Sequence, residues 1–265
     1  MRTARESADR HALRWLIGVL GIVAVVVGYA LYTRDPVVDC TDPTANASNT
    51  VLVIDRSESM SAQTIVEIEA RALAHVMARP VGERVSVFAV SDSSTNALLP
   101  LFDGCRTKTG SEANPLTEDG RRLERRFREN FLGPIATELR REVVGSRTTP
   151  LAQALTDLSL GSHLRGRENH LLVFSDLLEH TAGFSLYSCR DARSVIGDFR
   201  AARRGAVERP TFSNTSVQLH IVPRGGVSDA TIRCRDRLWP WFFGDSSGNS
   251  AGVSIAHLPG PAEVQ

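Results

Sequence analysis

Apolar residues along this chain gather into short continuous runs that end in polar residues. Runs of this kind are typical of strands that are buried on both faces of a sheet. They predict strands at residues 50–56, 84–90, 97–102, 169–176, 217–222 and 252–257. The segments between these strands have apolar residues at helical spacing, which predicts helices at 62–77, 117–144, 150–158, 190–203 and 230–243.

Two prolines refine the predicted helices. Gly133-Pro134 is expected to break the long helical segment 117–144, and Pro150 suits the first position of the next helix. Strands that alternate with helices predict an α/β fold with a Rossmann-like, doubly wound, mostly parallel sheet and helices on both faces. Ligands bind such sheets at the carboxyl ends of the strands.

One apolar run is too long for a strand. Residues 15–32 contain no charged residue, and as a helix they would span about 27 Å, close to the thickness of a bilayer core. Arginines precede this run and aspartates follow it, which places residues 1–14 in the cytoplasm. We therefore expect one N-terminal transmembrane signal anchor. A cleaved signal peptide is the alternative, with Gly28 and Ala30 as small residues before the cut.

The remaining chain divides into three parts. Residues 33–48 contain two Asp-Pro dipeptides and no periodicity, so they are interpreted as a linker. Residues 49–258 form the predicted domain, and residues 259–265 a C-terminal tail. The formal net charge is +1, so the chain has no overall field that would attract nucleic acid. Lys108 is the only lysine, a bias that indicates a GC-rich bacterial genome.

An exported domain lies in an oxidising compartment, where cysteines form disulfides. Cys40, Cys105, Cys189 and Cys234 are widely spaced and form no C-x-x-C pair, which argues against a zinc or thioredoxin-type site. In an oxidising compartment an even number of cysteines predicts two disulfides, for which three connectivities exist. We favour Cys189 with Cys234 and Cys40 with Cys105, and four free thiols are the alternative.

Candidate chemistry follows the first predicted strand. Asp55, Ser57 and Ser59 occupy alternate positions of the loop Asp55-Arg56-Ser57-Glu58-Ser59 and can turn toward one point. All three are hard oxygen donors, which suit Mg²⁺ or Mn²⁺ better than zinc or copper. By itself this D-x-S-x-S pattern is weak, because serine and aspartate are common in loops and helix caps.

Two later segments strengthen the hypothesis. Residues 148–155 read TTPLAQAL, and residues 173–176 read VFSD at the end of a predicted strand. Together with D-x-S-x-S, these segments resemble the von Willebrand factor type A family with a complete metal-ion-dependent adhesion site. The resemblance covers residues 49–223 and extends more loosely to 258. It implies that Ser57, Ser59 and Thr149 present hydroxyls to the ion, and that Asp55 and Asp176 bind it directly or through water.

The resemblance also implies a function. The ion, Mg²⁺ or Mn²⁺, would accept an acidic side chain from a protein partner as its last ligand, since Mg²⁺ keeps exchangeable waters. The expected protein is therefore not an enzyme. It is an exported domain in the bacterial inner membrane, with the domain in the periplasm, that mediates cation-dependent contacts in a cell-envelope complex. Glu58 stands where the family often has glycine.

Two alternatives remain open. A metal-independent structural or assembly factor would keep the fold without using the ion. A metal-dependent hydrolase would use Asp55 or a serine as nucleophile. Position 57 is serine instead of the second carboxylate usual in phosphoryl transfer, and no G-x-S-x-G motif surrounds Ser57, Ser59 or Ser175, which disfavours the hydrolase.

Overall fold

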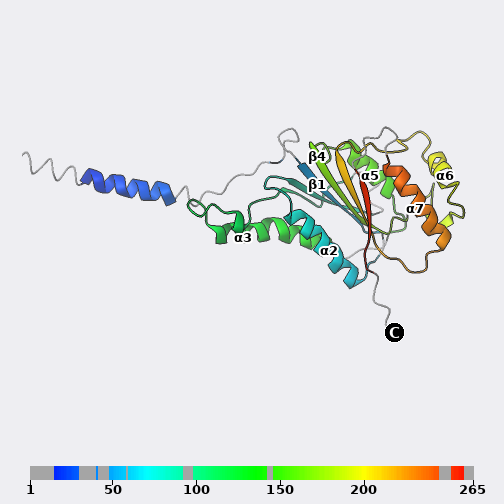
Figure 1. Ribbon diagram of the computed structural model, residues 1–265, viewed down its shortest axis with the longest axis horizontal. Coiled ribbons are helices and arrows are strands. Elements are labelled where there is room, and N and C mark those ends of the chain that lie inside the picture. Colours follow the sequence, from blue (N-terminus) through cyan, green and yellow to red (C-terminus); the bar gives the residue numbers. More distant parts are fainter. Residues whose placement is uncertain are drawn as a thin grey trace, which may run out of the picture. The chain divides into compact units, whose positions relative to one another are not determined.

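The computed structural model describes residues 15–29, 40, 48–57, 59–91, 98–141, 146–244 and 252–259. They belong to two compact units. One combines Met1–Val37 with Lys108–Phe127, and the other combines Val38–Thr107 with Arg128–Gln265. The second unit contains the whole sheet (Figure 1).

The sheet of the larger unit has six strands in the order β3-β2-β1-β4-β5-β6. All neighbouring strands are parallel except β2 and β3, which are antiparallel. The strand bounds are β1 (Ser48–Asp55), β2 (Arg84–Val90), β3 (Phe102–Cys105), β4 (Glu168–Ser175), β5 (Thr215–Ile221) and β6 (Val253–His257). From β1 the order runs to β2 on one side and to β4 on the other, so the topological switch point lies between β1 and β4.

Helices cover both faces of this sheet, as the doubly wound pattern predicts (Figure 1). On one face the apolar side chains of β1, β4 and β5 pack with α5 (Leu151–Leu160), α6 (Val195–Ala202) and α7 (Asp229–Phe243) in one buried core. On the other face α2 (Ala62–Met77) packs on β4 and beside α4 (Gly133–Arg140). Trp239 and Phe242 of α7 are fully buried, so the aromatic cluster of this helix belongs to the core.

Local sequence explains where the helices begin. Ser61 precedes α2, and its side chain accepts a hydrogen bond from the Thr64 backbone N–H at 3.1 Å. Ser228 caps α7 in the same way through Thr231. Such caps satisfy a backbone donor that has no partner within the helix.

The expected third strand was placed wrongly. The apolar run 97–102 predicted a strand there, but β3 spans Phe102–Cys105. Polar contacts select this segment: Oδ1 of Asp103 accepts hydrogen bonds from Arg84 and Ser86 on the adjacent β2. Gly133-Pro134 does not break the helical segment as expected: the π-helical turn Arg128–Leu132 continues directly into α4 at Gly133, and only the type of helix changes.

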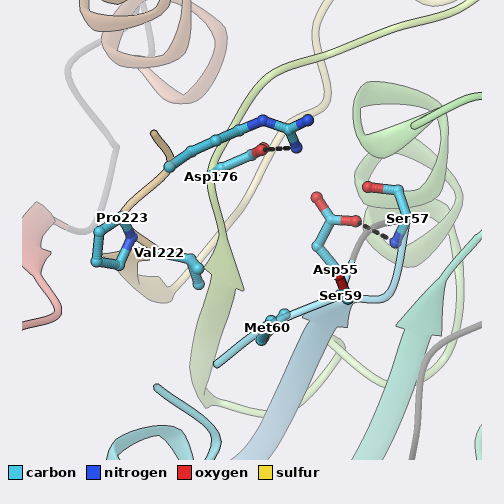
Figure 2. Close-up of a pocket in the computed structure, with 8 residues that line it drawn as sticks. Asp55, Ser57, Ser59, Met60, Asp176, Val222 and Pro223 are labelled. Atoms are coloured by element: carbon cyan, nitrogen blue, oxygen red, sulfur yellow. Dashed lines mark hydrogen bonds and ion pairs between the residues drawn. The ribbon is translucent and has the colours of Figure 1, made fainter. Parts of the chain in front are cut away.

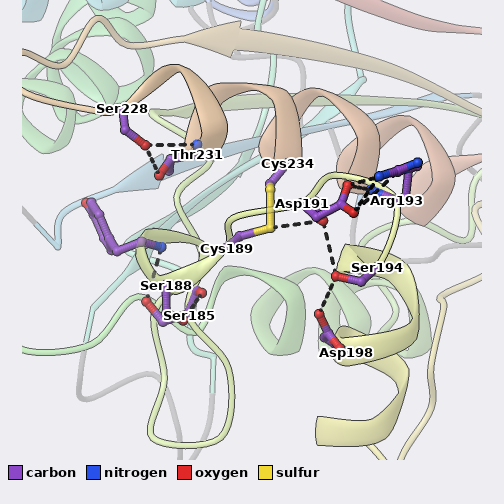
Figure 3. Close-up of a disulfide and its surroundings, with 11 residues drawn as sticks. Ser185, Ser188, Cys189, Asp191, Arg193, Ser194, Asp198, Ser228, Thr231 and Cys234 are labelled. Carbon is purple, nitrogen blue, oxygen red and sulfur yellow. Dashed lines mark hydrogen bonds and ion pairs between the residues drawn. A yellow bond between two sulfur atoms is a disulfide. The ribbon is translucent and has the colours of Figure 1, made fainter.

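Both favoured disulfides are present. Cys40 pairs with Cys105 at the end of β3, and Cys189 pairs with Cys234 in α7 (Figure 3). The first bond attaches the segment before β1 to the sheet, and the second attaches the loop between β4 and α6 to the last helix. Each closes a long loop and thereby restricts the unfolded chain.

The smaller unit contains a helix at residues 15–29, the 3-10 turn Gly110–Glu112 and α3 (Gly120–Phe127). Glu124 of α3 accepts a hydrogen bond from the Gly110 backbone N–H at 3.0 Å. No helix in the part of the chain that the structure describes is long and apolar enough to cross a membrane. Residues 30–32 of the expected anchor, most of the linker 33–48, and residues 260–265 of the tail lie outside the described residues.

Candidate metal centre

A cavity of about 60 Å³ opens at the carboxyl ends of β1, β4 and β5 (Figure 2). This is the edge of the sheet where ligands bind doubly wound folds, and it includes the switch point between β1 and β4. A volume of this size exceeds that of a single water molecule. The lining residues are Asp55, Ser57, Ser59, Met60, Asp176, Val222, Pro223 and Arg224.

Asp55 is the last residue of β1 and is only 4% exposed. Its Oδ1 accepts a hydrogen bond from the Ser57 backbone N–H at 2.9 Å, and its Oδ2 accepts one from the Ser175 hydroxyl at 2.6 Å. Burial and the nearby charge of Asp176 raise the pKa of Asp55 to about 6, although these hydrogen bonds act in the opposite direction. A nearby cation would favour the charged carboxylate.

Ser57 and Ser59 lie on the loop that leaves β1. Ser57 is buried, and its carbonyl accepts a hydrogen bond from the Ser146 backbone N–H at 2.8 Å. Ser59 is exposed at the cavity. Glu58, the residue that departs from the family pattern, lies outside the described residues.

Asp176 directly follows β4 and has a partner at each carboxylate oxygen. Its Oδ1 accepts a hydrogen bond from the Leu178 backbone N–H at 2.8 Å, the same type of turn that Asp55 makes with Ser57. Its Oδ2 forms an ion pair with Nη1 of Arg224 at 2.9 Å, marked by a dashed line in Figure 2. Sequence reasoning did not identify Arg224, which follows β5.

Thr149 is the one predicted ligand that is not among the residues lining this cavity. Its backbone N–H donates to the His180 carbonyl at 2.6 Å, and the His180 N–H donates back at 3.2 Å. Its loop is held near Ser57 through Ser146. The structure therefore brings four of the five predicted ligands together and places the fifth on a neighbouring loop.

The backbone after Asp176 has an unusual conformation. Leu177 has a φ of 60°, which a bulky residue adopts at a cost of about 1–2 kcal/mol. Its N–H donates to the Ser175 hydroxyl at 2.8 Å, and its carbonyl accepts a hydrogen bond from Nε1 of Trp239 at 2.7 Å. These two bonds hold the turn that presents Asp176 to the cavity.

A second buried carboxylate lies behind the site. Glu179 is 3% exposed, and its Oε2 accepts a hydrogen bond from the Ala152 backbone N–H at 2.9 Å at the start of α5. Burial raises the pKa of Glu179 to about 8, against the opposing effects of the Ala152 N–H and the charge of Arg203. Sequence reasoning missed Glu179. Its signal, like that of Arg224, was a charged residue shortly after a buried strand.

The donors at the cavity fit a small divalent cation. The side chains of Asp55, Ser57, Ser59 and Asp176 offer only oxygen atoms, and two of these residues are carboxylates. These oxygen donors suit Mg²⁺ or Mn²⁺. Within the described ranges, no group of three or more His, Cys, Asp and Glu residues could hold a metal ion.

The sequence matches no family model and no curated protein. Solved structures resemble it at low identity. The crystal structure of the ArnB paralog VWA2 from Sulfolobus acidocaldarius is 16% identical, with a TM-score of 0.41, over 83% of this chain and 43% of its own. The human COPII-coat protein Sec24c is 13% identical, with a TM-score of 0.38, over 85% of this chain and 32% of its own.

A third similar structure is the PilB minor pilin from Streptococcus sanguinis. It is 12% identical, with a TM-score of 0.38, over 82% of this chain and 58% of its own. This chain therefore spans less than two thirds of the length of each of the three structures.

Proposed function

We propose that this protein is an exported, membrane-anchored domain of the von Willebrand factor type A kind that binds a protein partner through Mg²⁺ or Mn²⁺. The observation that carries the proposal is the convergence of Asp55, Ser57, Ser59 and Asp176 on one cavity at the switch point of the sheet. These residues come from two loops that are about 120 positions apart in the sequence, and all four offer side-chain oxygen atoms as ligands.

In this proposal Asp55 and Asp176 contribute carboxylates, and Ser57 and Ser59 contribute hydroxyls. Thr149 adds a hydroxyl from the neighbouring loop. A bound cation would supply a Lewis-acidic position that accepts an acidic side chain of the partner. We assign no catalytic role to any of these residues.

The electrostatics of the cavity support cation binding. Asp55 is buried and lies close enough to Asp176 for the second carboxylate to raise its pKa. Two carboxylates in one partly desolvated cavity repel each other, and an ion of charge +2 would offset that repulsion. The serine hydroxyls add neutral ligands, so the bound ion would keep positive charge for an anionic group of the partner.

The proposed location is the bacterial inner membrane, with the N-terminus in the cytoplasm and the domain in the periplasm. Apolar side chains of the helix at 15–29 are exposed, for example 60% of Leu20, 67% of Ile22 and 71% of Val25. Exposed apolar residues in this number are typical of a surface that contacts lipid or another protein. The two disulfides favour an oxidising compartment.

A second candidate is a metal-independent scaffold in a cell-envelope assembly. The ion pair between Arg224 and Asp176 favours it, because the guanidinium already neutralises one of the two carboxylates. The partner would then bind a surface of the domain without a cation.

Calorimetric titration of the full-length chain with Mg²⁺ and Mn²⁺ separates the two candidates. We expect saturable binding that is lost in Asp55→Asn and retained in Asp236→Asn, a control at an exposed carboxylate of α7 whose side chain pairs with Arg235. Both variants should remain folded and unfold cooperatively. If neither cation binds to the folded wild type, the scaffold becomes the better interpretation.

A further inference from the structure

We propose that Arg224 is an internal competitor of the divalent cation, because its guanidinium holds the oxygen of Asp176 that the cation would use. The inference rests on the proposed cation site and concerns how tightly that site binds. Arg224 would thus be a positioning residue that keeps the affinity of the site low until the ion concentration is sufficient to displace it.

The first argument is geometric. Oδ1 of Asp176 accepts the Leu178 N–H at 2.8 Å, and Oδ2 lies 2.9 Å from Nη1 of Arg224. Arg224 and Asp176 both line the cavity that contains Asp55. A cation that bonds to Oδ2 of Asp176 must therefore displace the guanidinium or share this oxygen with it.

The second argument concerns where the guanidinium can go. Its central carbon lies 5.5 Å from the ring centroid of Tyr187, which is a cation–π contact. The side chain of Arg224 is 27% exposed, whereas that of Asp176 is 11% exposed. The guanidinium is therefore the more solvent-accessible member of the ion pair, and it already contacts the ring.

The third argument is the charge balance. Asp55 and Asp176 bring two negative charges to the cavity, and Arg224 brings one positive charge. In the ion-free protein Arg224 reduces the repulsion between the carboxylates, so it stabilises that state. In the ion-bound protein it faces a charge of the same sign, so it destabilises that state. The apparent affinity is the intrinsic affinity multiplied by the fraction of ion-free molecules in which Arg224 does not occupy Asp176.

These opposite effects give a signature that a merely structural residue would not produce. Removal of Arg224 should lower the melting temperature of the ion-free protein and, at the same time, tighten cation binding. If Arg224 only supported the loop, its removal would lower the melting temperature and would leave cation binding unchanged or weaker.

The experiment compares full-length wild type, Arg224→Ala, Arg224→Gln and Arg200→Ala. Arg200 forms an ion pair with Glu208 at 2.9 Å and does not line the cavity, so it controls for the loss of one surface charge pair. Mg²⁺ affinity is measured by calorimetry, and melting temperature is measured with excess chelator. We expect a Kd about tenfold lower in both Arg224 variants and a wild-type Kd in Arg200→Ala.

Each outcome decides a different claim. Binding that is tighter in the Arg224 variants, or that is detected only in them, supports the competition. Equal or weaker binding in folded Arg224 variants overturns it and leaves the cation site of the wild type intact. Absence of saturable binding in the wild type and in both variants overturns the cation site and the competition together. Arg224→Gln retains a polar side chain and provides the same comparison if the alanine variant does not fold.

Discussion

The Ser175 hydroxyl donates a hydrogen bond to Oδ2 of Asp55 over 2.6 Å, which joins the carboxyl ends of β1 and β4. The same oxygen of Ser175 accepts the N–H of Leu177 at 2.8 Å. One fully buried hydroxyl thus fixes both the first carboxylate of the cavity and the turn that carries the second. Ser175 has no solvent-exposed surface, so bulk water does not reach its hydroxyl.

Replacement of Ser175 by alanine should therefore destabilise the fold and weaken the site together. The change leaves Oδ2 of Asp55 and the N–H of Leu177 without this partner, at a cost of about 1–3 kcal/mol. Urea denaturation measures the loss. Ser159→Ala is the matched control, since its hydroxyl donates to the Thr156 carbonyl within α5, and it should cost less than about 1 kcal/mol. Equal costs in the two variants would contradict a special role for Ser175.

Trp239 should contribute to the site through a single hydrogen bond. Its Nε1 donates to the carbonyl of Leu177, which has the strained φ of 60°. Trp239→Phe removes this donor and leaves a buried carbonyl unsatisfied, so we expect a loss of about 1–3 kcal/mol and weaker Mg²⁺ binding. Trp241→Phe changes a partly buried ring that contacts Phe199, and it should leave Mg²⁺ affinity unchanged. Calorimetry and urea denaturation of both variants provide the comparison.

The regular elements were largely predictable from the sequence, because a helix buried along one stripe leaves a periodic apolar pattern and a strand buried on both faces leaves a continuous apolar run. Residues 62–77 and 84–90 match α2 and β2 residue for residue. The third strand was not predictable from apolar residues alone. β3 contains an aspartate and a glycine among its four residues, and it is selected by contacts with β2 that depend on the folded sheet.

The site was predictable only in part, for a related reason. Asp55, Ser57, Ser59 and Asp176 follow strands and carry a recognisable motif, and the cavity brings them together. Arg224 follows a buried strand, but its ion pair with Asp176 spans 48 residues, so the sequence does not indicate which carboxylate it contacts. The positive φ of Leu177 could not be predicted either, since no residue type at this position indicates it.

Glu179 should make stability fall as the pH rises from about 5 to about 8. Its pKa is raised from an ordinary 4.5 to about 8 in the folded protein, so the folded state retains a proton that the unfolded state has released. This contribution is complete below the unfolded pKa and is lost as the pH rises through about 8. The maximal slope is about 1.4 kcal/mol per pH unit, or about 2 kcal/mol between about pH 6.5 and pH 8.

Glu179→Gln tests this directly, because the amide resembles the protonated acid and does not titrate. We expect the variant to lose most of this pH dependence and to be more stable than the wild type at pH 8 in chemical denaturation. Glu168→Gln, at an exposed position at the start of β4, is the control and should follow the wild-type profile. A Glu179→Gln profile that is parallel to the wild type from pH 6.5 to pH 8 would exclude a protonated Glu179 in the folded state.

His220 and His75 should make stability fall as the pH decreases below about 6.5. Burial, assisted by nearby positive charges, lowers the pKa of each histidine from 6.5 to about 4. Neither ring nitrogen of His220 has a hydrogen-bond partner among the described residues. The unfolded state then binds protons that the folded state rejects, so stability falls as the pH decreases from about 6.5 toward about 4. Solvent screening limits the loss to about 1 kcal/mol per histidine at pH 5. Urea denaturation at pH 7 and pH 5 measures this loss. The His220→Leu variant should lose less stability between pH 7 and pH 5 than the wild type. The control His257→Leu, at an exposed position of β6, should lose as much as the wild type.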